Sequence, residues 1–376
     1  MPEAQPIENF GFSAIKQMHE LARIPRGATV WDESGFTWWI NDFRQRVWAE
    51  PLTGDEDAGF RICVATDFLG EVSAEPAKLA EQLTVSGRRN GITALVYDPA
   101  ERTVRHWTTV RVGATAGEWL LPMLIGASYA QASAVKTSHY TVPGLFGAVL
   151  DQTRPPVGKR SCVHEAVELW PTESQLEGKH PSAWTGSEEF AEAAGIFKTA
   201  GVDATVSPGG VAAELPFDAF AGISDGWARG RAASLAMVTE EPHPADGNGL
   251  RARLRLPLSL PKEDAEKLCV ALNLIETRDS RTSIAGCWCA EDGAPAFSGF
   301  VPNVMYVDGI VGAFAEAARA RLRWVADRMR GEDERRAAAG LIDSVARGPA
   351  KIAAIADQPR KAGMLRGLFG RRAANG

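Results

Sequence analysis

The sequence of 376 residues has few cysteines, no long apolar run and no excess of basic residues. Five cysteines, an odd number in so long a chain, are typical of reduced thiols and not of a disulfide framework. The most apolar stretch, Trp119 to Ala134, contains Ser128 and Gln131 and is short for a membrane span, so it predicts a core helix. The net charge of -6 argues against nucleic-acid binding, because phosphates require a cationic surface.

Signals for targeting, phosphate binding and metal binding are also missing. The N-terminus lacks the basic and apolar segments of a signal peptide, and we expect a cytoplasmic protein. Neither the phosphate-binding loop nor the dinucleotide fingerprint occurs. His164 and Glu168 stand one helical turn apart, a spacing that can hold a metal, but no third ligand is evident. Cys287 and Cys289 share one face of a predicted strand, which favours burial. We therefore expect no metal and no cofactor.

One short motif is typical of an enzyme. Residues 222–226 match the G-x-S-x-G nucleophile elbow, which requires a buried strand before the serine and an acid and a histidine after it. The segment before Ser224 is a poor strand, and His243, the only later histidine, lies in a turn. We expect the protein not to be an enzyme. The alternative is a hydrolase with a site between two halves of the chain, with Ser224, His164 and His243 as the residues to follow.

What the sequence does contain is one pattern of elements twice, about 190 residues apart. Each copy has the predicted order α-β-β-β-α-β-β-α, with a hairpin and a long apolar helix at its end. The sequence thus predicts an α+β protein of two such units, each an antiparallel sheet flanked by helices. We place the units at 1–136 and 188–330, with a partly ordered connection at 137–187 and a helical basic tail at 331–376.

The predicted strands of the two units have definite positions. Those of the first unit lie at 36–40, 44–49 and 60–69, with a hairpin at 92–112. Those of the second lie at 211–216, 232–239 and 250–258, with a hairpin at 283–302. In the connection, the sequence predicts only a short helix, from Cys162 to Trp170, before Pro171.

Several segments of the second unit resemble a known superfamily. They are residues 250–260, the helix after Pro261, the strand Gly286–Cys289 with its return at Phe297–Phe300, and the closing helix. With their counterparts in the first unit, they resemble the superfamily of type III secretion chaperones and YbjN-like proteins. The resemblance implies a binding protein without catalytic residues. Because the secretion chaperones are typically small homodimers that hold an extended client segment, two fused copies imply a monomeric pseudo-dimer. Such a protein would bind a protein partner or client through sheet edges or helix faces.

Aromatic residues on predicted strands are the candidates for partner contacts. They are Trp38, Trp39, Trp288 and Phe300. Aromatic side chains are favoured at interfaces, and the adjacent Trp38 and Trp39 must face opposite sides of their strand. The alternative is that both are buried within the protein.

The C-terminal tail is the second candidate contact surface. From Arg347 onward it has seven basic residues and one acidic residue. A helix over 361–372 would combine apolar and cationic side chains, and its candidate contacts are Leu365, Arg366, Leu368, Phe369, Arg371 and Arg372. Such a helix can lie weakly on an anionic membrane surface or dock on a partner. The alternatives are thus a peripheral membrane adaptor, a partner-docking helix, or a disordered solubilising tail.

Overall fold

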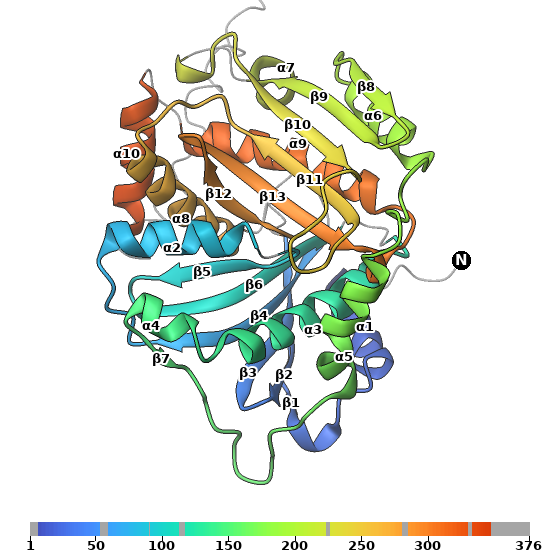
Figure 1. Ribbon diagram of the computed structural model, residues 1–376, viewed down its shortest axis with the longest axis vertical. Coiled ribbons are helices and arrows are strands. Elements are labelled where there is room, and N and C mark those ends of the chain that lie inside the picture. Colours follow the sequence, from blue (N-terminus) through green and yellow to red (C-terminus); the bar gives the residue numbers. More distant parts are fainter. Residues whose placement is uncertain are drawn as a thin grey trace, which may run out of the picture.

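Two antiparallel sheets covered by helices make up the computed structural model (Figure 1), which confirms the predicted α+β class. The structure describes residues 7–52, 59–89, 91–112, 117–222, 226–279, 285–329 and 333–346. The first sheet has the strand order β1-β2-β3-β4-β6-β5, and the second has the order β12-β13-β11-β10-β9-β8. The second sheet lies above the first in Figure 1.

The first half of the chain forms the first sheet and its helices. Its elements are α1 (Ile7–Leu21), β1 (Thr29–Trp31), β2 (Gly35–Ile40), β3 (Phe43–Pro51), β4 (Phe60–Gly70), α2 (Pro76–Gly87), β5 (Ala94–Asp98), β6 (Thr103–Val112) and α3 (Leu120–Ser138). The connection contains α4 (Val142–Phe146), β7 (Val149–Leu150), which pairs with β4, and α5 (Glu165–Glu177).

The second half has the same order of strands and long helices, with the short helix α7 added between its second and third strands. Its elements are α6 (Glu189–Lys198), β8 (Ala204–Ser207), β9 (Gly210–Pro216), α7 (Phe217–Ala221), β10 (Ala232–Val238), β11 (Gly249–Arg255), α8 (Lys262–Arg278), β12 (Cys287–Glu291), β13 (Ala294–Pro302) and α9 (Ile310–Arg328). The helix α10 (Glu334–Ala346) follows and contacts α8. The six tail residues from Leu365 to Arg372 that the sequence singles out lie outside the described residues.

The structure corrects two details of the predicted order. Four strands precede α2 in the first half and α8 in the second, not three, because β1 and β8 pair with the strands that follow them. Strands of three or four residues are too short to show a clear alternation of apolar and polar residues. In the connection, α5 continues through Pro171 to Glu177. A proline removes one backbone hydrogen bond from a helix, whereas burial of Val167 and Ser174 on both sides of Pro171 favours its continuation.

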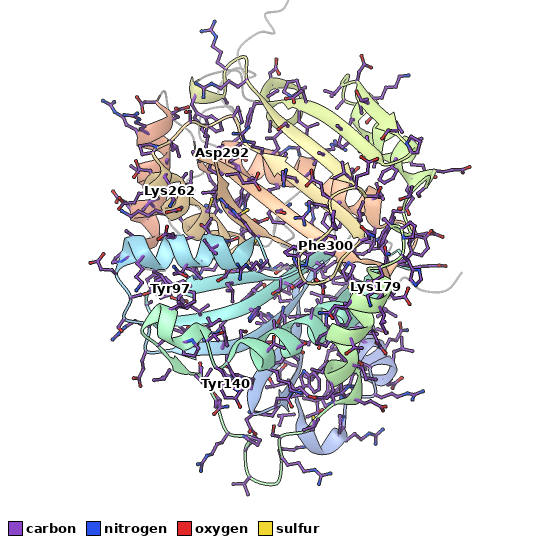
Figure 2. The ribbon with its side chains drawn as sticks, in the orientation of Figure 1. Tyr97, Tyr140, Lys179, Lys262, Asp292 and Phe300 are labelled. Carbon is purple, nitrogen blue, oxygen red and sulfur yellow. The ribbon has the colours of Figure 1, made fainter. Side chains whose placement is uncertain are left out.

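The two halves are in contact through α2 and α8. α2 contacts both α8 and β12, and α8 contacts β5 in return. Lys262 at the start of α8, which is labelled in Figure 2, forms an ion pair with Glu81 of α2 at 2.9 Å. At the other end of α2, the Cys287 thiol of β12 donates to the Gly87 carbonyl at 3.0 Å.

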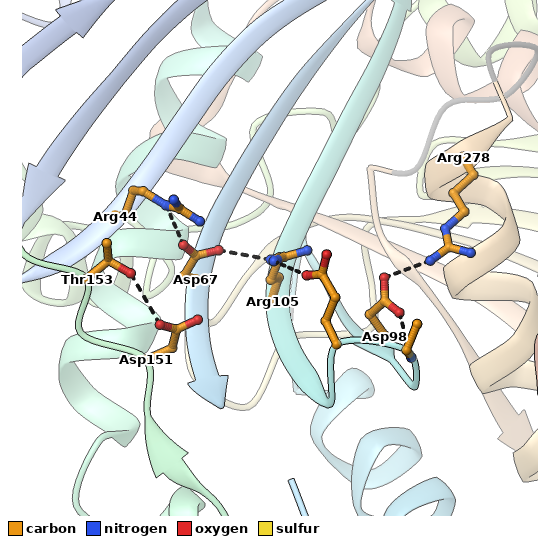
Figure 3. A network of polar contacts seen from close by, with 9 residues as sticks. Arg44, Asp67, Asp98, Arg105, Asp151, Thr153 and Arg278 are labelled. Carbon is orange, nitrogen blue, oxygen red and sulfur yellow. Dashed lines mark hydrogen bonds and ion pairs between the residues drawn. The ribbon is translucent and has the colours of Figure 1, made fainter. Parts of the chain in front are cut away.

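Figure 3 shows two separate sets of ion pairs at one end of the first sheet. In the first, the nearly buried Asp67 carboxylate accepts from Arg44 at 2.6 Å and from Arg105 at 2.9 Å. In the second, Asp98 at the end of β5 pairs with Arg278 at the end of α8, at 2.7 Å. Polar groups also join the halves inside the contact, where the buried Arg61 guanidinium donates to the Asp279 carbonyl at 2.7 Å.

Between α3 and the first sheet lies a buried polar network. Gln45 accepts from the Trp38 indole at 2.7 Å and donates to Thr66, also at 2.7 Å. Gln131 of α3 accepts from Thr66 at 2.8 Å and donates to Thr108 at 3.0 Å. The polar residues of the most apolar stretch thus face the sheet, and each amide has partners there. Among the described helices, none has the length and apolarity needed to cross a bilayer.

Candidate functional site

A cleft of about 540 Å³ lies between the two halves, along α9. One wall is the end of β6 and the start of α3, which contribute Val110, Trp119 and Met123. The facing wall is α9, with Phe297 of β13 and Ile196 of α6 beside it. The cleft therefore requires both halves, and most of its lining side chains are apolar.

The side of α9 that lines the cleft is made of small and basic residues. Its small residues are Gly312, Ala313, Ala317 and Ala320. Glycine and alanine leave space above the helix backbone that larger side chains would fill. This space is the reason that a cleft exists here and not a packed helix surface.

Arginines are the charged groups that dominate the lining. Arg111 comes from β6, and Arg319, Arg321 and Arg323 come from α9, against the single carboxylate of Glu316. Arg319 and Arg323 are one helical turn apart, so they lie on the same side of α9. Arg319 also pairs with Glu316 at 3.2 Å. The lining as a whole is positively charged.

Arg321 is held rigidly at the inner end of the cleft. Its guanidinium donates to Glu276 of α8 at 2.8 Å and lies over the Phe297 ring at 3.4 Å. Glu276 also accepts from the Trp288 indole at 2.7 Å. Burial raises the pKa of the Glu276 carboxyl and lowers that of the Arg321 guanidinium, and each group opposes the shift of the other. The two side chains are thus fixed against each other in a buried position.

A second feature is the open edge of the second sheet. β8 pairs with β9, and the structure describes no strand on its other side. Thr205, Val206 and Ser207 are exposed, with Val206 at 45%. A shallow hollow of about 620 Å³ lies over the sheet face beside this edge, between Thr205 and Arg255. Three of the four residues of β8 are therefore exposed, while Ala204 is half-buried.

The aromatic residues singled out from the sequence lie inside the protein. Trp38, Trp39, Trp288 and Phe300 have exposed fractions of 0%, 5%, 1% and 1%. Phe300, labelled in Figure 2 where the second sheet meets the first, stacks on the His243 ring at 4.8 Å between ring centres. Trp38 and Trp39 are thus both buried within the protein, which is the alternative stated for them above. These four side chains are therefore covered by the protein itself and are not exposed to a partner.

Two of the hydrolase candidates, His164 and His243, lie in the described part of the chain and have separate partners there. His164 lies 2.9 Å from the Ala22 carbonyl, whereas Glu168 pairs with Lys136. His243 lies 2.9 Å from Asp246 within its own turn. Ser224 lies outside the described residues. Among the described residues, no three His, Cys, Asp or Glu side chains are placed to hold a metal. Cys287 and Cys289 are buried, as the sequence predicts.

The arginine-lined cleft was missed by the sequence analysis. A signal for it exists in the closing helix, where Arg319, Arg321 and Arg323 alternate with other residues over one turn. The apolar positions of that helix place Arg321 beside the stripe that faces the sheet, where an arginine requires a buried partner. Arg111 and Trp119 gave no such signal, because their role depends on the packing of the two halves.

No protein-family model, no curated protein and no solved structure matches this chain.

Proposed function

We propose that the chain is a non-catalytic binding protein in which two units pack as a pseudo-dimer and a partner protein adds an extended segment at β8. The observation that carries the proposal is the exposed, unprotected edge of the second sheet. An exposed strand edge offers a row of backbone donors and acceptors, and strand addition uses these groups for affinity.

The pseudo-dimer is supported by the connectivity and by the contacts between the halves. Both sheets have their first four strands in sequence order, followed by the last strand and then the one before it. α2 lies against α8 and β12, and α8 lies against α2 and β5, so each half offers the same elements to the other. Reciprocal use of one surface is the property of a two-fold contact.

The other three edges are less accessible than β8. β5 and β12 face the junction, where α8 and α2 contact them. On the outer side of the first sheet, the connection pairs with the end of β2 beyond β1. There, Asn41 donates to the Cys162 carbonyl and Cys162 donates to the Trp39 carbonyl, both at 3.0 Å. The protein thus already adds a segment of its own chain at the outer edge of one sheet.

The residues of β8 favour pairing. Its sequence Ala-Thr-Val-Ser has no proline or charged residue, the devices that usually protect an edge strand. Thr205 and Val206 are β-branched and suit an extended conformation. The partner that fits this edge is an extended peptide segment, whose side chains on one face would border the hollow beside β8.

The test uses proline substitutions in β8. Backbone N–H groups alternate between the two sides of a strand, so one of Thr205→Pro and Val206→Pro removes an outward-facing donor. Partners are identified by co-purification and mass spectrometry, and the amount retained is then compared among variants. We expect at least one proline variant to lose the partner while its circular dichroism spectrum is unchanged.

Val206→Ala is the matched control, because it shortens the side chain and keeps the backbone donor. It should retain the partner. Retention by both proline variants would contradict strand addition at β8. A concentration-dependent dimer mass for the purified protein that the same prolines abolish would instead identify a second copy of the chain as the occupant.

A further inference from the structure

We propose that the segment added at β8 is basic, with a lysine or arginine on the face that borders the hollow beside this strand. The inference rests on the proposed strand addition and adds the chemistry of the partner. The hollow of about 620 Å³ extends from β8 across β9 and β10 to β11, on one face of the second sheet. An added strand would place every second side chain on this face.

The floor of the hollow consists of small side chains. They are Ala212 of β9 and Ser234 and Ala236 of β10. The first sheet has large side chains on its corresponding face, which is turned away from α3. There, Trp48 and Trp107 pack with their ring centres 5.2 Å apart. The small residues of the second sheet leave space along which the apolar stem of a lysine or arginine can lie.

Two carboxylates lie side by side at the edge of the hollow nearest to β8. Ala204 of β8 pairs with Ala213 of β9, so continuing the register by one residue places Asp203 opposite Glu214. Both of these acidic side chains are exposed and line the hollow, and neither has a hydrogen-bond or ion-pair partner among the described residues. Like charges directly opposite each other on a sheet are destabilising, and a cation beside them would relieve the repulsion.

The two arginines of the hollow lie farther from the edge. Arg253 and Arg255 belong to β11, three strands away from β8, and neighbouring strands are about 4.8 Å apart. Arg253 also pairs with Glu241 at 3.4 Å and with Glu291 at 3.5 Å. Asp292 of the turn between β12 and β13, labelled in Figure 2, adds a further carboxylate on that side. The uncompensated charge that an added strand meets first is therefore negative.

Fluorescence anisotropy of three labelled octapeptides, titrated with the full chain at low ionic strength, tests the inference. In each peptide, threonine alternates with one other residue, which is lysine, glutamine or glutamate. Alternate residues of a strand share a face, so all copies of this second residue can face the hollow together. We expect saturable binding of the lysine peptide, about tenfold weaker binding of the glutamine peptide, and the weakest binding for the glutamate peptide.

Three variants distinguish these carboxylates from the general negative charge of the protein. Asp203→Asn and Glu214→Gln should each weaken binding of the lysine peptide about fivefold to tenfold. Glu173→Gln, at an exposed position of α5, is the matched control and should leave this binding unchanged. Unchanged binding in both hollow variants, or equal weakening by the control, would overturn the inference.

The proline variants of β8 separate the failure of this inference from the failure of strand addition. Equal binding of the lysine and glutamine peptides that Thr205→Pro or Val206→Pro abolishes would refute the basic preference and leave strand addition intact. Binding of the lysine peptide that neither proline affects would contradict pairing with β8, and this inference with it. Absence of binding by all three peptides would overturn the inference, and the co-purified partner would then decide strand addition.

Discussion

Replacing Arg321 by methionine should strongly destabilise the protein, because it leaves a carboxylate buried without its cation. The Arg321 and Glu276 side chains are 3% and 0% exposed, and their charged atoms are 2.8 Å apart. Methionine fills much of the same space without a charge. Glu276 would keep one hydrogen bond, from the Trp288 indole.

The expected loss is about 3–5 kcal/mol in the free energy of unfolding, the usual cost of removing one partner of a buried ion pair. The double variant Arg321→Met/Glu276→Gln should recover most of this loss, because its amide carries no charge and its oxygen can still accept from Trp288. Buried ion pairs are often replaceable by neutral residues at little cost. The difference between the single and double variants therefore measures the uncompensated charge and not the lost packing.

The pH dependence gives a second measure of the same charge. Burial raises the pKa of Glu276 and the charge of Arg321 lowers it, so the Arg321→Met variant has the higher pKa in the folded state. A carboxyl with a raised pKa binds more protons when folded, and its contribution to stability is lost as the pH rises through the folded pKa. The loss caused by Arg321→Met should therefore be larger at pH 8 than at pH 5.

Urea denaturation followed by circular dichroism at pH 5 and pH 8 provides the measurement. Protonation of other groups, such as His106, affects the wild-type protein and the variant alike and cancels in the difference. An equal loss of stability at both pH values would refute the buried carboxylate as the cause. A double variant as unstable as the single variant would show that the packing of the arginine side chain dominates.

Three further predictions concern the core and the junction of the halves. Burial lowers the pKa of His106 to about 3, so the stability that the neutral ring contributes above pH 6.5 is lost as the pH falls toward 3. In urea denaturation at pH 4 to 6, the free energy of unfolding should therefore depend less on pH in His106→Leu than in the wild type, by about 1.4 kcal/mol per pH unit. Gln131→Leu removes the acceptor of the buried Thr66 hydroxyl and the amide donor to Thr108, and should cost about 2 kcal/mol or more in urea denaturation, whereas the exposed Gln175→Leu should cost little. Gly91→Ala would place its Cβ 2.9 Å from the Phe300 carbonyl oxygen and should lower the free energy of unfolding by about 1–3 kcal/mol; Gly195→Ala, with open space in α6, should be neutral or stabilising.

Much of the fold could be predicted from the sequence because local patterns specify it. The α3 region was predicted as a core helix from its apolar residues, and Ser128 and Gln131 within it face the sheet. The long strands are rich in apolar residues, as β4 is over Phe60–Gly70, where most residues are apolar and only Gly70 is not buried. β1 and β8 were not predicted as strands, because their short lengths depend on a neighbouring strand for hydrogen bonds.

The cleft could not be predicted because its walls come from distant parts of the sequence. Val110, Trp119, Ile196 and Phe314 meet only when the end of β6 and the start of α3 lie near α6 and α9. Partner contacts could not be predicted from residue type alone for a similar reason. Tryptophans suit an interface and a core equally well, and Trp38 has its hydrogen-bond partner, Gln45, within the protein. Whether such a tryptophan packs in the core or contacts a partner depends on whether another part of the chain covers it.

The packing of α2 and α8 determines which sheet edges remain open. Each helix belongs to one half and also contacts the edge strand of the other half, so the inner edges of both sheets are removed from further pairing. The same arrangement brings α3 beside the start of α9, where Gly126 lies against Met305 and Trp119 against Gly309, and so forms the cleft. One packing of the two halves thus covers the inner edges of both sheets, leaves β8 exposed on the outer side, and forms a cleft to which both halves contribute.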